Sequence, residues 1–159
     1  MPITQVLIAD RLWSGASSAR HKEWRTLISD LLSGEPPFPA SAATTLIVDC
    51  DDEAVTFLFE GDSDSDDEDG ERTVPREEIA ALLKEYLIVI DQLGDEGLHP
   101  MRAEALDMAK RVVHDDGGRT LVMLMPDLSP SVDTCRRVFS VVVSLAVDTT
   151  KRAWAHRHA

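Results

Sequence analysis

The segment with the densest chemistry is an acidic run at residues 60–71, in which eight of twelve residues are acidic and none is basic. Its central carboxylates are Asp62, Asp64, Asp66, Asp67, Glu68 and Asp69. Asp62, Asp64 and Asp66 fit positions one, three and five of a calcium-binding loop. Position six is Asp67 instead of glycine, and position twelve is Thr73 instead of a bidentate glutamate. We therefore predict a solvated loop without a specific metal, whose best functional use is docking a basic partner.

A second candidate is the doublet His114–Asp115, because metal-dependent phosphohydrolases use such a pair with further ligands on other helices. His99, the only upstream histidine nearby, stands beside Pro100 in a predicted loop. The alternative is a structural histidine at a helix C-terminus, where the helix dipole favours positive charge. The alternative is favoured, and no metal or cofactor is predicted.

Nucleophile motifs are missing from the sequence, which has no GxSxG, GxxxxGK[ST] or GxGxxG pattern. Cys135 precedes Arg136 and Arg137 near a predicted helix start, a setting that lowers the pKa of a thiol. A buried structural cysteine is the favoured alternative. Cys50 and Cys135 form no CxxC motif, which indicates free thiols in a reducing compartment. No catalytic residue is predicted.

The first sixty residues predict strands and one helix. Branched apolar residues indicate a strand at 3–9, and helical periodicity indicates a helix at 19–32. The runs 44–49 and 54–60 are separated only by CDDE, which indicates an antiparallel hairpin.

The remaining elements are predicted to be helices. One runs from Pro75 to about Leu93, a second over 100–115, and a third from Ser131 to about 147. The apolar face of the second helix is Met101, Ala105, Met108, Ala109 and Val112. Gly117–Gly118 is expected to break or bend the chain, and residues 119–125 fit either a helix or a strand.

We expect one α+β domain over residues 1–159: a small antiparallel sheet with one helix, followed by a bundle of about three helices. Its parts are a strand–helix–hairpin unit (1–60), the acidic loop (61–73), the helical part (74–148) and a frayed tail (149–159). The helices at 76–93 and 131–147 carry more apolar surface than a small core needs, which would allow a homodimer.

Charge and hydropathy narrow the function. The net charge is −13, and the acidic run supplies more than half of it. Nucleic-acid binding is disfavoured, because it needs clustered lysine and arginine. The start MPITQVLIADRLW lacks the pattern of a signal peptide, and no apolar run is long enough to span a bilayer. A cytoplasmic protein is expected.

Three segments together resemble a known family: PREEIAALLKEYLIVIDQL, ALDMAKRVVHDDGGRTL and TCRRVFSVVVSLAV. They are similar to uncharacterised protein family 0262, a group of short bacterial proteins with no assigned activity. A family pattern like I-D-M-G-R-R-G-L-H-N-E is matched at Leu106, Asp107, Met108, Arg111 and His114, and departs at six other positions. A later A-R-R-L-F pattern is matched at Arg136, Arg137 and Phe139. The resemblance supports an α+β domain and a helical 131–147, and it implies no catalytic residues.

The matched polar residues could converge if the last two helices pack together. They are Asp107, Arg111, His114, Arg136 and Arg137. Such a set would form a polar network that fixes helix register, or else an anion site, and the network is favoured.

The sequence predicts a non-enzymatic cytoplasmic protein that binds another protein, as an adaptor, small chaperone or regulator. Its partner is expected to have a basic surface that the acidic loop would dock. The alternative is a small hydrolase or anion-binding enzyme with a site near His114, Asp115, Arg111 and Arg136.

Overall fold

The structure is a computed structural model, and it describes residues 2–61, 70–94 and 97–151. The predicted docking carboxylates of the acidic run, from Asp62 to Asp69, lie outside the described residues, as does the tail from 152 onward.

A four-stranded sheet forms one layer of the fold, with strand order β1-β2-β3-β4. The strands are β1 (Gln5–Ile8), β2 (Thr45–Cys50), β3 (Ala54–Glu60) and β4 (Glu71–Pro75). β2 and β3 form the predicted antiparallel hairpin, and β4 pairs antiparallel with β3. β1 pairs with β2 in parallel, so the sheet is mixed instead of wholly antiparallel. The long connection from residue 9 to 44 makes this possible, because a parallel pair needs a crossover that a helix usually supplies.

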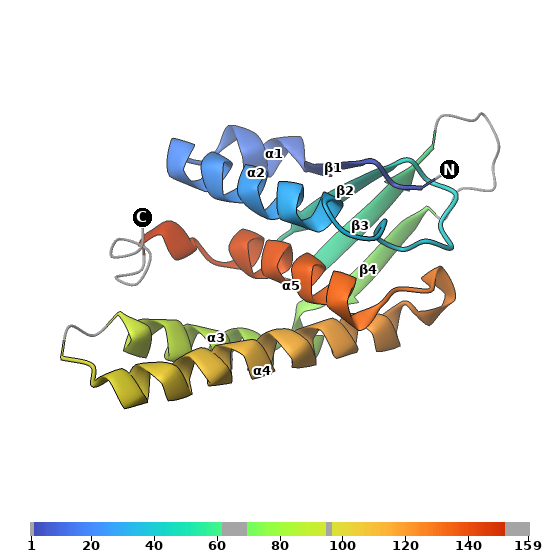
Figure 1. Ribbon diagram of the computed structural model, residues 1–159. Coiled ribbons are helices and arrows are strands. Elements are labelled where there is room, and N and C mark those ends of the chain that lie inside the picture. The colour runs from blue at the N-terminus through green and yellow to red at the C-terminus, as the bar shows by residue number, and fades with distance from the viewer. Residues whose placement is uncertain (1, 62–69, 95–96, 152–159) are drawn as a thin grey trace.

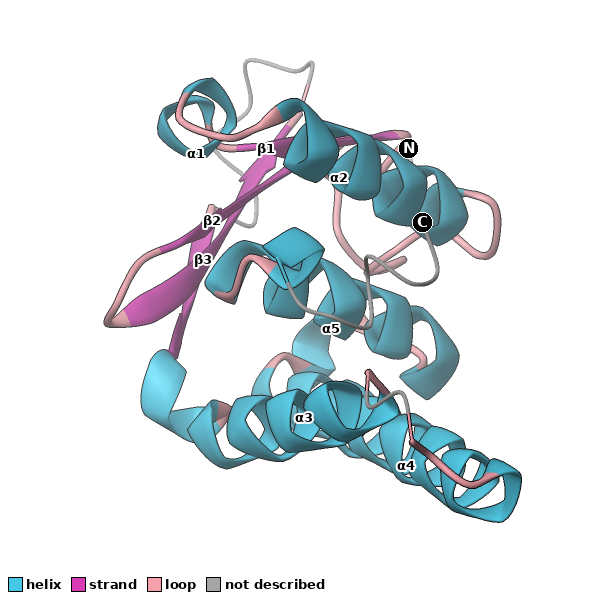
Figure 2. Cartoon of the chain, turned by 90° about the vertical axis from the view of Figure 1, so that its left-hand side faces the viewer, coloured by secondary structure: helices cyan, strands magenta, loops and turns pink. Residues whose placement is uncertain are grey.

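The helices gather on one face of this sheet (Figure 2). They are α1 (Asp10–Ser14), α2 (Ser18–Leu32), α3 (Ala80–Leu93), α4 (Pro100–Leu124) and α5 (Val132–Ala146), with short 3₁₀ turns at Arg76–Glu78, Pro126–Leu128 and Thr149–Lys151. α5 packs against α2, α4 and β2, and α3 packs against α4 (Figure 1). None of the described helices combines the length and the apolar composition that crossing a bilayer requires. The α+β class with a C-terminal helical bundle is confirmed.

α5 is the centre of the core. Nine of its residues are buried, among them Val138, Phe139 and Val142. Trp24 of α2 and Phe57 of β3 are fully buried in the same cluster. The extra apolar surface predicted on residues 131–147 is therefore buried within the chain, because α5 is covered on several sides at once.

Gly117–Gly118 does not break the chain, and residues 119–124 continue α4 as a helix. The glycines instead allow α5 to approach. A Cβ on Gly117 would lie 2.4 Å from the Phe139 ring, and one on Gly118 would lie 2.9 Å from the Val132 carbonyl oxygen. A mid-helix glycine costs roughly 0.5–1 kcal/mol relative to alanine, and here the close helix crossing offsets that cost.

The same crossing sets the rotation of α4 about its axis. Because Gly117 must face α5, Leu106, Val113 and Leu121 are the buried apolar side chains of the helix. The predicted apolar face lies on the other side, where Met101 is 75% and Met108 is 54% exposed. The apolar face named from the sequence is therefore not the side of α4 that packs into the core.

Two further boundaries differ from prediction. β4 was not predicted, because its only buried apolar residue is Val74 and its other side chains are mostly polar. The predicted frayed tail starts too early, because Thr149 is buried and its Oγ1 donates a hydrogen bond to Glu23 Oε1 at 2.6 Å.

Candidate functional site

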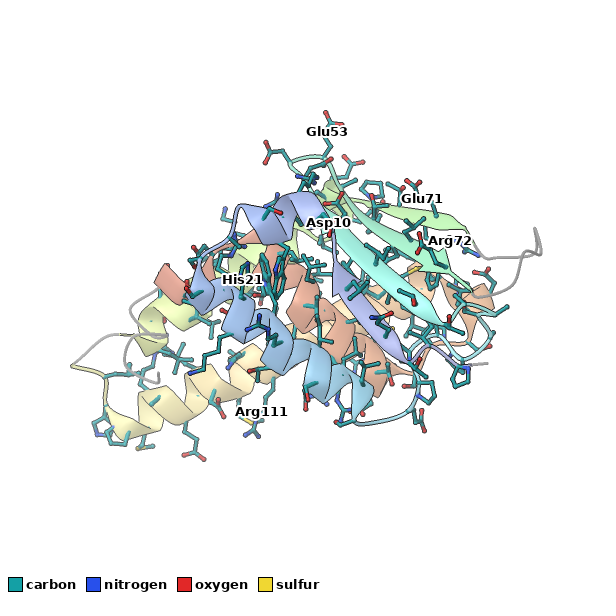
Figure 3. The ribbon with its side chains drawn as sticks, turned by 90° about the horizontal axis from the view of Figure 1, so that it is seen from above. Asp10, His21, Glu53, Glu71, Arg72 and Arg111 are labelled. Carbon is teal, nitrogen blue, oxygen red and sulfur yellow. The ribbon has the colours of Figure 1, made fainter. Side chains whose placement is uncertain are left out.

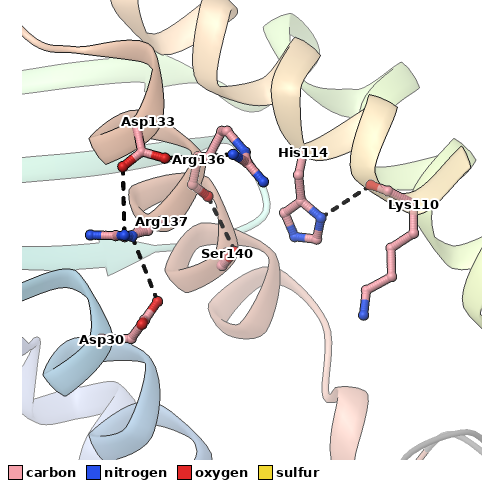
Figure 4. A pocket seen from close by; sticks show the side chains of 7 residues that line it. All are labelled: Asp30, Lys110, His114, Asp133, Arg136, Arg137 and Ser140. Atoms are coloured by element: carbon pink, nitrogen blue, oxygen red, sulfur yellow. Dashed lines mark hydrogen bonds and ion pairs between the residues drawn. The ribbon is translucent and has the colours of Figure 1, made fainter. Parts of the chain in front are cut away.

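A polar pocket of about 330 Å³ lies between α4, α5 and the end of α2. Its lining side chains are Asp30, Lys110, His114, Asp133, Arg136, Arg137 and Ser140 (Figure 4). The packing of α4 against α5 therefore brings together three predicted site residues, His114, Arg136 and Arg137. Lys110, Asp30 and Asp133 join them without having been predicted.

Both arginines of the pocket are held by carboxylates. Arg136 Nε lies 2.8 Å from Asp115 Oδ1 on α4, and Arg136 Nη1 lies 3.5 Å from Asp133 Oδ1. Arg137 lies between Asp30 Oδ2 at 3.8 Å and Asp133 Oδ2 at 3.5 Å. Asp115, which the sequence offered as half of a metal-binding doublet, thus links α4 to α5. Each arginine therefore has two carboxylate neighbours that offset its charge.

Gly34 contributes to this network by having no side chain. A Cβ at this position would stand 2.2 Å from Arg137 Nη1. Gly34, two residues beyond the end of α2, therefore leaves room for the guanidinium to reach Asp30.

His114 is half-buried at the inner wall of the pocket. Its ring meets Tyr86 and Phe139 edge to face, with centroids 5.2 and 5.9 Å away. Nδ1 lies 3.1 Å from the Lys110 carbonyl oxygen, which can only accept, so Nδ1 carries the proton. Burial lowers the pKa of His114, which makes the neutral ring the resting form near pH 7.

Lys110 and Ser140 are the other polar side chains of the pocket that carry neither a carboxylate nor a guanidinium. Burial also lowers the pKa of Lys110 from its ordinary value. The Ser140 hydroxyl donates to the Arg136 carbonyl oxygen of its own helix at 3.2 Å. Within the described residues, no group of three His, Cys, Asp or Glu side chains is arranged to hold a metal ion.

Asp107 and Arg111, two further predicted site residues, do not line the pocket. They form an ion pair of 3.1 Å on the exposed side of α4, with 51% and 65% of their side chains exposed. Figure 3 shows Arg111 pointing outward from α4, far from Glu53 and Glu71 at the sheet.

Cys135 is fully buried, and burial raises the pKa of its thiol to about 12. The favoured interpretation, a structural cysteine, agrees with this environment, because a thiol with so high a pKa is a poor nucleophile.

A second surface is the face of the sheet that bears no described helix. Its twelve outward positions alternate with buried ones, and they include three acidic residues and no basic one. Leu7, Ile47 and Leu58 stand side by side across β1, β2 and β3 in this face, and Glu71 of β4 completes the row. Leu7 is 42% exposed. The alternation of residues along each strand is visible in the sequence. Only the pairing register between the strands shows that these three residues form a row.

Carboxylates border this row at both ends of the strands. Asp49 lies at the hairpin end, where Arg11 Nη2 pairs with it at 2.6 Å. Glu60 and Glu71 are exposed at the opposite end, where the acidic run connects β3 to β4. The surface is therefore aliphatic in the middle and acidic at the end that bears Glu60 and Glu71, whereas Arg11 offsets the charge of Asp49 at the hairpin end.

Comparison with known proteins finds relatives that belong to an uncharacterised family. The chain is 27% identical over 115 residues to a UPF0262 protein of Cereibacter sphaeroides, which covers 70% of each chain. It is 31% identical over 67 residues to a UPF0262 protein of Agrobacterium fabrum, covering 40% of this chain and 43% of that one. A UPF0262 protein of Paracoccus denitrificans is 35% identical over 66 residues, covering 40% and 41%. No solved structure matches significantly. Residues 2–148 match the family as a whole, so the chain belongs to the uncharacterised protein family UPF0262.

Proposed function

We propose that this chain is a non-enzymatic protein-binding protein whose docking surface is the open face of the sheet. The observation that carries the proposal is the aliphatic row Leu7–Ile47–Leu58 in a face with three acidic positions and no basic one. An apolar centre inside a charged rim is the usual anatomy of a protein interface.

The partner is a protein with basic residues around an apolar spot. Opposite charge at the rim steers such a partner toward the face and excludes acidic proteins. The acidic run joins Glu60 to Glu71 along the chain, and these two carboxylates lie at the same end of the sheet. The docking role expected for the run is thereby extended to the strands that flank it.

The pocket on α4 and α5 supports a binding protein over an enzyme. Arg136 and Arg137 each contact two carboxylates. A substrate anion would have to displace these ion pairs. A cytoplasmic location fits the proposal, because Cys50 and Cys135 are both buried free thiols.

A second candidate is an anion-binding or hydrolytic site in that pocket. The observation that favours it is the convergence of Lys110, His114, Arg136 and Arg137 around one cavity. Arg111, which the sequence placed in this site, lies on the outer face of α4 and takes no part.

The test of the proposed function is affinity capture from native lysate with a matched pair of variants. Thr56→Lys puts a positive charge on the open sheet face, and Thr26→Lys puts the same charge on exposed α2. The proposal expects a basic protein that the intact chain and Thr26→Lys capture and Thr56→Lys does not. A variant with Asp62–Asp69 changed to serine and asparagine measures the contribution of the acidic run. Equal capture by both lysine variants refutes the sheet face as the docking site.

A further inference from the structure

The outward face of α4 carries an exposed apolar stripe. Met101, Ala105, Met108 and Val112 follow one another at intervals of four, three and four residues, which is the spacing of a coiled-coil seam. Met101, Met108 and Val112 are 75%, 54% and 52% exposed. The core side of the helix is opposite, at Leu106 and Val113. No described element of the chain covers the stripe, and contiguous exposed apolar side chains of this size mark a contact surface.

The charges of α4 cancel, so this helix adds nothing to the net negative charge of the protein. From Pro100 to Leu124 the helix has four basic and four acidic residues, so its net charge is zero, whereas the whole chain carries −13. Two copies of so acidic a protein repel each other over most of their surface. A contact between two neutral helices avoids most of this repulsion.

We propose that the stripe binds the α4 helix of a second copy of this chain, antiparallel and related to it by a two-fold axis. In this arrangement Met101 lies opposite Val112 of the second copy, and Ala105 lies opposite its Met108. Each of these two pairings occurs twice, so all four pairs of facing residues are apolar. A two-fold contact repeats each of these pairings, so the same short stripe serves both copies.

Charges beside the stripe select this register. Glu104 and Arg111 flank it on the same side, seven residues apart, so Glu104 of each copy faces Arg111 of the other. The register shifted by seven residues would place Arg111 against itself and Asp115 against Ala105. Arg111 already pairs with Asp107 of its own helix at 3.1 Å, in an exposed ion pair at the margin of the stripe. Its guanidinium can therefore bridge Asp107 and the glutamate of the second copy.

This dimer is independent of the proposed function, because α4 belongs to the helical layer and not to the open sheet face. A dimer of this kind would carry two open sheet faces. A single pair of helices buries less than the roughly 1,600 Å² of a standard interface, so dimerisation depends on protein concentration.

Sedimentation equilibrium of the purified chain over a range of concentrations tests the inference. We expect a monomer–dimer equilibrium that Met108→Glu abolishes and Met123→Glu leaves unchanged. Met123 is 79% exposed on the same helix but lies outside the paired segment, so it is the matched control. Circular dichroism of each variant verifies that it is folded.

Charge reversal tests the register itself. Glu104→Arg and Arg111→Glu should each weaken the dimer about tenfold, because each sets like charges against one another twice. An equimolar mixture of the two variants restores both attractive pairs and should recover dimerisation at the strength of the intact chain. A chain that is monomeric at every concentration overturns the inference, as does a mixture that fails to recover. Neither result affects the capture experiment with Thr56→Lys, so the two proposals fail separately.

Discussion

Arg136 Nε of α5 lies 2.8 Å from Asp115 Oδ1 of α4, and this ion pair stands beside Gly118, where the two helices cross. A Cβ on Gly118 would lie 3.0 Å from the Arg136 backbone nitrogen. The glycine permits the close approach, and the ion pair spans the two helices at the same place. Gly117–Gly118, which suggested a chain break, and His114–Asp115, which suggested a metal site, thus both lie where α4 crosses α5.

Gly117→Ala should destabilise the protein by about 1–3 kcal/mol, because the new methyl group would overlap the Phe139 ring. In an unobstructed helix the same change would raise the free energy of unfolding by roughly 0.5–1 kcal/mol. The sign of the change in this free energy therefore distinguishes the two cases. Urea unfolding measures the free energy. Gly15→Ala is the control, because its Cβ would meet only the Arg11 carbonyl oxygen at an ordinary 3.6 Å. Stabilisation by Gly117→Ala would contradict the crossing.

His114 should make the protein less stable in mild acid. Its pKa is below the ordinary 6.5 in the folded state because of burial, so between the two values the unfolded chain binds more protons. Stability is therefore unaffected above about pH 6.5 and decreases as the pH falls from there toward the folded pKa. Thermal unfolding of the intact chain and of His114→Asn across this window should differ in slope. Identical slopes would show that His114 titrates normally.

Cys135 should resist thiol reagents as long as the protein is folded. Burial raises its pKa to about 12, so at pH 8 almost no thiolate exists, and the side chain is fully covered. Labelling with a disulfide reagent, resolved by peptide mass spectrometry, should modify Cys135 only at the rate of unfolding. Cys50, which is 5% exposed, is the internal comparison. Rapid labelling of Cys135 would indicate a reactive thiol instead of a structural cysteine.

Inorganic phosphate should not bind the pocket in the intact protein, because Arg136 and Arg137 are paired with Asp115, Asp133 and Asp30. The His114 ring signals in a phosphate titration by NMR should stay in place. Asp133→Asn removes a partner from both arginines and should create weak, salt-sensitive binding. Saturable shifts in the intact chain would favour the anion-binding or hydrolytic alternative.

The elements that the sequence predicted well are those with a strong local pattern. The hairpin of β2 and β3, helix α2 and helix α5 all have a clear apolar period and a recognisable start or stop. β4 has only Val74 as a buried apolar residue, so its pairing with β3 decides its structure. The direction of β1 depends on its crossover to β2, which no local pattern shows.

The sequence predicted only part of the candidate site, because packing between helices decides which residues meet there. His114, Arg136 and Arg137 were matched to a family pattern, and the packing of α4 on α5 brings them together. Asp107 and Arg111 lie on the same helix as His114 but on its outer side, because Gly117 sets the rotation of α4. The row Leu7–Ile47–Leu58 joins three strands, and only their register reveals it.

The most direct test of the central claim is site-specific photo-crosslinking in living cells. A photoreactive amino acid at Thr56 on the open sheet face is compared with the same group at Thr26 on α2. The account predicts an adduct with a basic protein at position 56 and none at position 26. In lysates the yield at position 56 should fall as salt is added, because salt screens the charged rim. No adduct at position 56, or equal adducts at both positions, would contradict the claim that the open sheet face binds a partner.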